Sequence, residues 1–232
     1  SASVLRNINR DKYNVYTLGI TKDGRWLFYE GDIDSLENNS WIEKNTVSAI
    51  ISPDKLEKSL LVFNGEKIEQ IQLDIILPVM HGKNGEVGTI QGIFEMADIA
   101  YVGCTPLAGA MCMDKAITNT ICDAAGIPQA KWVVVTSGED FEKCADKIES
   151  ELGYPCFVKP ARLGSSVGIG KSHNRQELMD ALYNAEKYDR RILVEEHIDG
   201  HEVECAVLGN KEPRAATVGE IRPTVEYYDF DA

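Results

Sequence analysis

The chain has 232 residues, of which 44% are hydrophobic and 26% are charged, and this composition excludes a disordered or fibrous protein. Its 37 acidic residues outnumber its 24 basic ones, and the net charge of -13 repels nucleic acids and anionic membrane surfaces. Neither is expected as a partner, and a phosphate-bearing ligand would need lysines or arginines concentrated at its site.

The first part of the chain predicts an α/β domain. Asp23-Gly24 separates two β-rich segments, as in a hairpin. The apolar run at 74–80 is typical of a strand buried on both faces of a parallel sheet, and a helix and a strand follow it as in a βαβ unit. We expect a helix at 1–8, strands at 13–20, 26–29 and 74–80, a helix over 88–97 and a strand at 99–102.

The second part predicts helices alternating with pairs of strands, an α+β arrangement. Thr105-Pro106 is a cap followed by proline at the first helical position, so we place a domain boundary near residue 105. Ser137 and Asn174 are expected to cap the next two helices. The expected elements are helices at 105–126, 137–152 and 174–187, and strands at 131–136, 156–159, 167–172, 192–195 and 202–208.

A Gly/Ser-rich loop lies between two of these strands. A Walker loop needs four residues between its glycines, whereas Gly164 and Gly170 enclose five, and the glycine spacing of a Rossmann fingerprint fails as well. The remaining interpretation is a hairpin tip whose amides and hydroxyls cover a phosphate, with Lys159 supplying charge from the adjacent strand. A plain surface turn fits the local sequence equally well.

Three other places carry residues suited to a site, and each also has an ordinary structural interpretation. The acidic end of the strand at 192–195 could hydrogen-bond an adenine edge and ribose hydroxyls, or could simply be solvated. His81 lies between a strand end and a helix start, where carboxylates or phosphates bind, or serves as a structural histidine. Lys115 lies in a helical stretch, where a solvated side chain is the default.

The six cysteines are dispersed without a CxxC pair, so neither a zinc site nor a disulfide framework is predicted, and a reducing compartment fits best. The longest apolar run is far shorter than the ~18 residues that span a bilayer, and the opening residues lack the pattern of a signal sequence. We expect a cytoplasmic protein.

Taken together, five segments resemble the D-alanine-D-alanine ligase family in order and spacing. They are HGKNGEVGTIQGIFE, MDK, KPARLGSSVGIGK, VEEHIDGHEVECAVLG and the final YYDFDA. The resemblance implies an α/β protein of the ATP-grasp fold, with an N-terminal parallel α/β domain followed by an α+β ATP-binding part. It divides the chain into a substrate domain at 1–104, a central ATP-grasp subdomain with a phosphate lid at 105–191 and the start of a C-terminal subdomain at 192–232.

The resemblance also implies ATP and Mg²⁺ as cofactors and D-alanine as the substrate. In the family, the carboxylate of one D-alanine attacks the γ-phosphate of ATP, and the amine of the second substrate attacks the resulting acyl phosphate. Matched by motif, Lys115 and Lys159 would contact the ATP phosphates, and Ser165 and Ser166 would belong to the lid over them. Glu195, Glu196 and Ile198 would contact adenine, and Glu202 would contact the ribose. His81 would lie beside the carboxylate of the first D-alanine, and Ser165 would help to hold the loop around it.

The chain departs from the family pattern at three places. Val87 stands where members usually carry aspartate, the opening begins just after the family's Gly-rich N-terminal loop, and the end comes before an expected Lys-Tyr pair. The Mg²⁺ ligands are expected beyond Ala232, so no metal-binding residue is predicted here and the 232-residue form is expected to be inactive alone. We therefore expect it to be part of a longer protein.

Within the family, a D-alanine-D-serine ligase of the vancomycin-resistance type is the alternative, because the first region is nearer to that branch. A nucleotide-binding module without chemistry and another ATP-grasp ligase are further alternatives. Since members of the family are commonly dimers, the resemblance also implies a homodimer.

Overall fold

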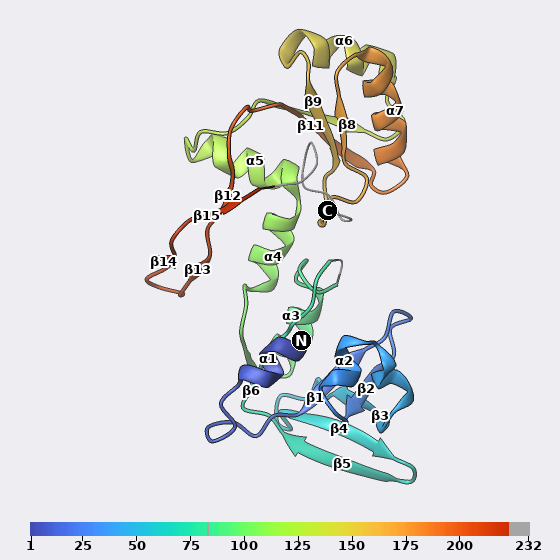
Figure 1. The fold of residues 1–232 in the computed structure, drawn as a ribbon, viewed down its shortest axis with the longest axis vertical. Coiled ribbons are helices and arrows are strands. Elements are labelled where there is room, and N and C mark those ends of the chain that lie inside the picture. The colour runs from blue at the N-terminus through green and yellow to red at the C-terminus, as the bar shows by residue number, and fades with distance from the viewer. Residues whose placement is uncertain (83, 223–232) are drawn as a thin grey trace. The chain divides into compact units, whose positions relative to one another are not determined.

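The structure is a computed structural model that describes residues 1–82 and 84–222 and forms two compact units, Ser1–Gly109 and Ala110–Ala232 (Figure 1). The YYDFDA segment lies outside the described residues. Among those described, no helix is both long and apolar enough to cross a membrane.

The first unit is built on a five-stranded antiparallel sheet, in the order β1-β2-β3-β4-β5. The predicted hairpin is confirmed, because Thr17 pairs with Tyr29 and Ile20 with Trp26 on either side of Gly24, which turns with a φ of 85°. The strands β3, β4 and β5 of this sheet were not predicted from the sequence. The strands are β1 Thr17–Ile20, β2 Trp26–Tyr29, β3 Thr46–Ile51, β4 Ser59–Asn64 and β5 Lys67–Gln72, and three short helices accompany them, α1 Ala2–Asn7, α2 Asp34–Glu37 and the 3-10 helix Ser40–Glu43.

The core of the first unit lies between this sheet and α3 (Thr89–Met96). Ile90 and Phe94 are four positions apart on one face of the helix, as the sequence predicted, and both are buried. They pack with buried residues of the strands, Phe28, Ala49, Ile51, Leu60 and Val62. The Gln91 side chain of this helix donates to Gly85 O at 2.8 Å, which ties the helix to the preceding loop that contains His81.

The βαβ unit is confirmed, since β6 (Ile75–Ile76) pairs in parallel with β7 (Ala100–Tyr101) and α3 lies between them in the chain. The expected burial of the strand at 74–80 is wrong. Only two of its residues form a strand, and Ile75 is 51% exposed. Ile75, Leu77 and Val79 are exposed, whereas Ile76 and Met80 pack against the core, so only one face of the run is covered.

The second unit contains a four-stranded antiparallel sheet in the order β10-β9-β11-β8. Buried residues alternate along its strands, so that Cys156, Val158, Ile192 and Val194 pack against two helices on one face. The α+β prediction is confirmed. The elements are β8 Trp132–Thr136, α6 Phe141–Glu151, β9 Cys156–Pro160, β10 Gly170–Ser172, α7 Arg175–Glu186 and β11 Arg191–Glu196.

The two predicted helix caps have different outcomes. Asn174 caps α7 by accepting a hydrogen bond from the backbone N–H of Glu177 at 3.1 Å, which confirms the predicted cap. The Glu177 carboxylate accepts from the backbone N–H of His173, the residue before the cap, at 2.8 Å, in place of the N–H of Asn174 that a capping box would use. The expected Ser137 cap is wrong. Asp140 is the residue that caps α6, and the Ser137 hydroxyl donates to the Glu186 carboxylate at 2.7 Å.

The expected single helix at 105–126 is two helices, α4 (Pro106–Met113) and α5 (Lys115–Ala124). Asp114 separates them with extended backbone angles, and its carboxylate accepts a hydrogen bond from Ile117 N at 3.2 Å as the cap of α5. Lys115 is therefore the first residue of a helix. The strand expected at 202–208 is likewise divided, into β12 (Glu202–Glu204) and β13 (Val207–Leu208), which pair with β15 (Gly219–Ile221) and β14 (Arg214–Ala215).

Candidate functional site

Lys159 and Glu195 form the centre of a charged cluster on the second unit's sheet. Lys159 of β9 lies opposite Leu193 of β11, so Glu195, two positions further along, projects from the same face as a diagonal neighbour. Their side chains form an ion pair and are only 25% and 16% exposed, respectively. Lys159 and Glu195 alternate along their strands with the core residues Val158 and Val194, which pack under α6 and α7. The charged cluster therefore lies on the face of the sheet opposite to these helices.

Helix α5 brings two more polar side chains to this face. The ammonium of Lys115 donates to the carbonyl oxygens of Pro160, at 3.2 Å, and of Leu163. One turn later, the Asn119 amide donates to the second Glu195 carboxylate oxygen at 3.0 Å. Because these contacts require Lys115 at the start of α5, the break at Asp114 is part of the site.

The cluster is electrostatically coupled. Burial, followed by repulsion from the Lys159 ammonium, lowers the pKa of Lys115, while the carboxylates of Glu195 and Asp189 oppose this shift. Two ammonium groups at such a place favour an anion with several oxygens, such as a phosphate chain. This is the local concentration of positive charge that an acidic protein needs for such a ligand.

The Gly/Ser loop is a hairpin connection, as predicted, because β9 and β10 pair antiparallel with Val158 opposite Gly170. Ser165 and Ser166 both adopt left-handed backbone angles, with φ of 51° and 56°. Such angles cost on the order of 1 kcal/mol for residues other than glycine, and they concentrate at functional sites. At Gly168, with φ 73°, a Cβ would lie 2.8 Å from the Tyr188 ring, so glycine is required there.

The other end of the proposed nucleotide site is less tightly organised. The Glu196 carboxylate accepts a hydrogen bond from Lys131 N at 2.8 Å, and its own N–H donates to Lys131 O at 3.0 Å. Ile198 is exposed beyond the end of β11, and Glu202 is exposed at the start of β12. Among the described residues, neither contacts the cluster formed by Lys115, Lys159 and Glu195.

His81 lies in the first unit, on the loop before α3. Its side chain is 88% exposed, and its Nδ1 is 3.9 Å from a Glu86 carboxylate oxygen, an ion pair only when the histidine is protonated. The other Glu86 oxygen accepts a hydrogen bond from Gly82 N at 2.5 Å. Sequence reasoning missed Glu86, although it stands in the same HGKNGE segment; as an acidic residue five positions after the histidine it could have been singled out.

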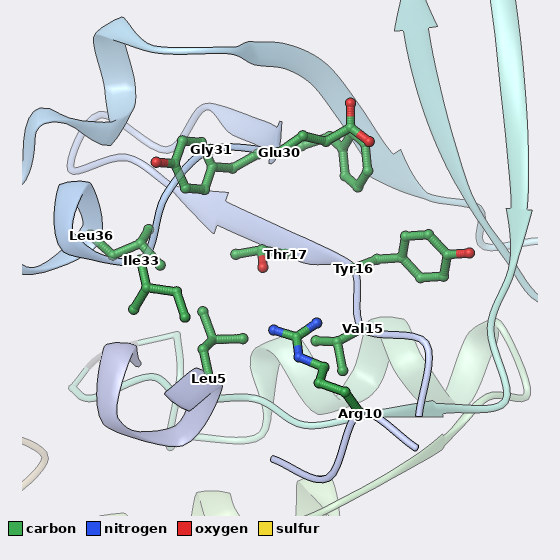
Figure 2. Close-up of a pocket in the computed structure, with 11 residues that line it drawn as sticks. Leu5, Arg10, Val15, Tyr16, Thr17, Glu30, Gly31, Ile33 and Leu36 are labelled. Carbon is green, nitrogen blue, oxygen red and sulfur yellow. The ribbon is translucent and has the colours of Figure 1, made fainter. Parts of the chain in front are cut away.

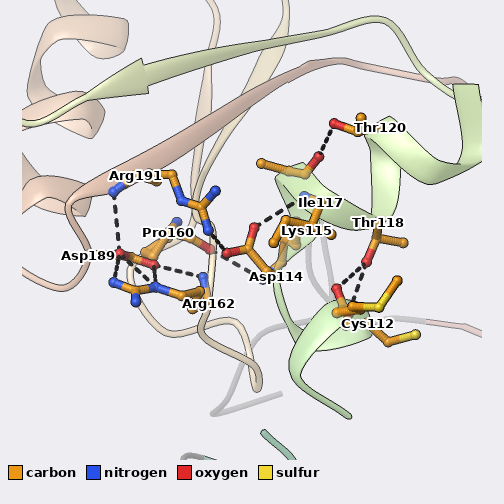
Figure 3. Close-up of polar contacts among 12 residues, drawn as sticks. Cys112, Asp114, Lys115, Ile117, Thr118, Thr120, Pro160, Arg162, Asp189 and Arg191 are labelled. Carbon is orange, nitrogen blue, oxygen red and sulfur yellow. Dashed lines mark hydrogen bonds and ion pairs between the residues drawn. The ribbon is translucent and has the colours of Figure 1, made fainter. Parts of the chain in front are cut away.

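Sequence reasoning also missed four charged residues beside Lys115 (Figure 3). Asp114 pairs with Arg191, and Asp189 accepts hydrogen bonds from Arg162 Nη2 at 2.6 Å and Arg162 N at 2.8 Å. The two carboxylates are 3% and 2% exposed. Burial alone would raise the pKa of Asp189, but its hydrogen bonds with Arg162 and Arg191 N outweigh this and lower it.

A separate hollow of about 260 Å³ lies in the first unit, and Figure 2 shows the Arg10 side chain pointing into it toward Thr17. None of the residues proposed for a site lines it. In the part of the chain that the structure describes, no group of three or more side chains could hold a metal ion.

Two family models match the chain, "D-ala D-ala ligase N-terminus" over residues 1–104 and "D-ala D-ala ligase C-terminus" over residues 121–232. The chain belongs to the D-alanine-D-alanine ligase family. It is 47% identical to the D-alanine--D-alanine ligase of Thermoanaerobacter sp. (strain X514), over 99% of this chain and 64% of that protein. With the D-alanine--D-alanine ligase of Acetivibrio thermocellus it shares 46% identity, over 100% of this chain and 66% of that protein.

Solved structures of ligases also match. The VanG D-Ala:D-Ser ligase from Enterococcus faecalis aligns with a TM-score of 0.89 at 40% identity, over 98% of this chain and 66% of that one. The D-alanine-D-alanine ligase from Coxiella burnetii aligns with a TM-score of 0.85 at 29% identity, over 95% of this chain and 64% of that one. The fold is therefore ATP-grasp, and the chain spans about two thirds of the length of these ligases.

Proposed function

We propose that this chain supplies the N-terminal and ATP-binding parts of an ATP-dependent D-alanine-D-alanine ligase of peptidoglycan precursor synthesis. The observation that supports this most directly is the pair of lysines, Lys115 and Lys159, beside a strained Gly/Ser loop in a chain of this family. Within this proposal we keep the division into a substrate domain at 1–104, an ATP-grasp subdomain at 105–191 and the start of a further subdomain at 192–232.

The phosphates of ATP are proposed to bind at Lys115 and Lys159 under the loop that contains Ser165 and Ser166. The fit is favourable, because a lysine ammonium has three donors and Lys159 gives one to Glu195, which leaves others for phosphate oxygens. Ser165 and Ser166, both with left-handed backbone angles, are the central residues of a tight turn in which Val167 N donates to Gly164 O at 3.3 Å, and we propose that this turn covers the phosphates. A loop that closes over ATP would also exclude water from a hydrolysable intermediate.

The nucleoside is proposed to bind at the end of β11. Glu196 already uses its N–H toward Lys131, so its carbonyl and the backbone of Ile198 are the groups that we assign to the adenine edge. Glu195 borders the same place and holds Lys159, and Glu202 is assigned to the ribose hydroxyls.

His81 is proposed to lie beside the carboxylate of the first D-alanine, and Ser165 is proposed to support the loop network around that substrate. In the proposed reaction this carboxylate attacks the γ-phosphate, ADP leaves, and the amine of the second D-alanine displaces phosphate from the acyl carbon. The contribution of this chain's residues is to hold charge and to position the reactants.

Mg²⁺ is used by this family, but the described residues offer no cluster of ligands for it, so no step is assigned to it here. The enzyme is proposed to be cytoplasmic, because its substrates are, and to be a homodimer as its relatives commonly are.

A D-alanine-D-serine ligase is the second candidate. The match to the VanG D-Ala:D-Ser ligase, at 40% identity and a TM-score of 0.89, favours it specifically. The two candidates share the ATP site and the first substrate, and they differ only in the second substrate.

The test is phosphate release by the full-length protein with ATP, Mg²⁺ and D-alanine, with and without D-serine, and mass spectrometry of the product. We expect release that depends on D-alanine and a D-alanyl-D-alanine product. A D-alanyl-D-serine product would select the second candidate. Release that does not depend on D-alanine would refute both.

A further inference from the structure

Two buried carboxylates, Asp114 and Asp189, lie directly behind the lysines and the loop described above. We propose that they are positioning residues of the phosphate site, which hold Lys115 and the first residue of the Gly/Ser loop in place through Arg191 and Arg162. This inference rests on the proposed ATP-binding function and adds two residues to it. Figure 3 shows the contacts, all within the second unit.

Asp114 determines where Lys115 lies. Its carboxylate caps α5 through Ile117 N at 3.2 Å and pairs with Arg191 at the start of β11, so the helix start is tied to the sheet. The adjacent Lys115 N–H donates to Ala161 O at 2.9 Å, and its ammonium to Pro160 O at 3.2 Å. The capping role alone would need no arginine, since neutral residues cap helices as well.

Asp189 determines where the loop begins. It accepts hydrogen bonds from Arg162 at three donors, the backbone N at 2.8 Å, Nε at 3.2 Å and Nη2 at 2.6 Å, and from Arg191 N at 3.3 Å. Arg162 is the second residue after β9 and opens the loop that carries Ser165 and Ser166. A carboxylate that is 2% exposed and accepts this many bonds is a rigid anchor.

Arg191 links the two halves, because its side chain pairs with Asp114 while its backbone N–H donates to Asp189 and its carbonyl accepts from Ala161 N at 3.0 Å. The lysine and the loop therefore share one support. Loss of one carboxylate would let the lysine or the loop shift away from the phosphate oxygens, and the weakened hydrogen bonds should be measurable in ATP binding.

Simple electrostatics predicts the opposite effect, which makes the test decisive. Asp189 places negative charge near a proposed polyphosphate site, and its removal would also free Arg162 as an extra cation. If charge alone mattered, Asp189→Asn would strengthen ATP binding. If position matters, the same variant weakens it.

The experiment uses the full-length protein and measures kcat and KM for ATP and for D-alanine in Asp189→Asn and Asp114→Asn. We expect the KM for ATP to rise about tenfold in Asp189→Asn and about fivefold in Asp114→Asn, while kcat at saturating ATP changes less than about twofold. The KM for D-alanine should stay unchanged. Asparagine keeps the cap at position 114, so this variant carries the test if Asp189→Asn does not fold.

Asp140→Asn is the matched control. Like Asp114 in α5, Asp140 is the cap of its helix, α6, where it accepts from the second helical residue, Glu142 N, at 3.2 Å, but its salt-bridge partner is the exposed Lys143. We expect its KM for ATP to match that of the wild type. Folded Asp189→Asn and Asp114→Asn proteins with an unchanged or lower KM for ATP would overturn the inference. Failure of the wild type to use ATP with D-alanine would instead overturn the proposed function.

Discussion

Lys159 has two separable roles in the structure, as the partner of Glu195 and as a proposed phosphate ligand. Lys159→Met removes the cation and leaves Glu195 with the Asn119 amide at 3.0 Å as its hydrogen-bond donor. Removing one partner of a fully buried pair costs about 3–5 kcal/mol. Because this pair is partly exposed and Asn119 remains, we expect about 2 kcal/mol for Lys159→Met.

The double variant Lys159→Met/Glu195→Gln separates the roles. It removes the unpaired carboxylate, so its stability should return to within about 1 kcal/mol of the wild type. The affinity for ATP should not return, because a charge-assisted hydrogen bond of about 1.5–3 kcal/mol is still missing, which corresponds to a loss of roughly 10- to 140-fold.

Thermal denaturation and ATP titration of the full-length variants provide the measurement. At about 2–4 °C per kcal/mol, the single variant should melt about 4–8 °C lower than the wild type. Lys143→Met is the control, since Lys143 is exposed and pairs with Asp140 at 3.4 Å, and its change should stay below about 0.5 kcal/mol. Recovery of ATP affinity together with stability in the double variant would refute a phosphate contact by Lys159.

Three further predictions concern other parts of the chain. Asn174→Ala should cost about 1 kcal/mol in urea denaturation, because the Glu177 N–H loses its acceptor, whereas Asn174→Asp should cost less. Gly88→Ala should lower the melting temperature by several degrees, because φ is 89° and the new Cβ would lie 2.4 Å from Pro106 O. ATP binding should weaken as pH rises through the lowered pKa of Lys115, because only the protonated ammonium attracts phosphate, and this loss should occur at a lower pH than for an ordinary lysine. Lys115→Met should remove this pH dependence of ATP affinity. If the same loss of affinity with rising pH persists in the variant, it belongs to another group.

Local signals in the sequence predicted those elements whose causes lie within a few residues. The Asp23-Gly24 turn and the Asn174 helix cap are examples, because both the cause and the effect lie within a few residues of each other. The strand β5 was missed because it is exposed along nearly its whole length, so its sequence lacks the alternation of apolar and polar residues that indicates a half-buried strand. The predicted burial of the run at 74–80 was wrong because burial of both faces requires a layer packed on each, which a local pattern does not specify.

For the candidate site, the sequence suggested residues but not their arrangement. Lys115 looked like a solvated helix residue, because the carbonyl oxygens that its ammonium contacts belong to Pro160 and Leu163, 45 and 48 positions later in the chain. Asp189 lies 27 positions from Arg162, and nothing near it in the sequence suggests that its carboxylate is buried. Buried ion pairs between distant segments are fixed by tertiary packing, which single-sequence patterns do not contain.

The balance of charge in this network leads to a last prediction. The network contains four cationic side chains and three carboxylates, so it carries a net charge of about +1. The cations are Lys115, Lys159, Arg162 and Arg191, and the carboxylates are Asp114, Asp189 and Glu195. So small a local charge, within a protein of net charge -13, gives little long-range attraction for ATP. Binding must then depend on short, directed hydrogen bonds, which salt screens weakly. We expect the KM for ATP of the full-length enzyme to rise less than about threefold from low to physiological salt, at constant free Mg²⁺. A steep rise would mean that general electrostatic attraction, and not the positioned lysines, holds the nucleotide.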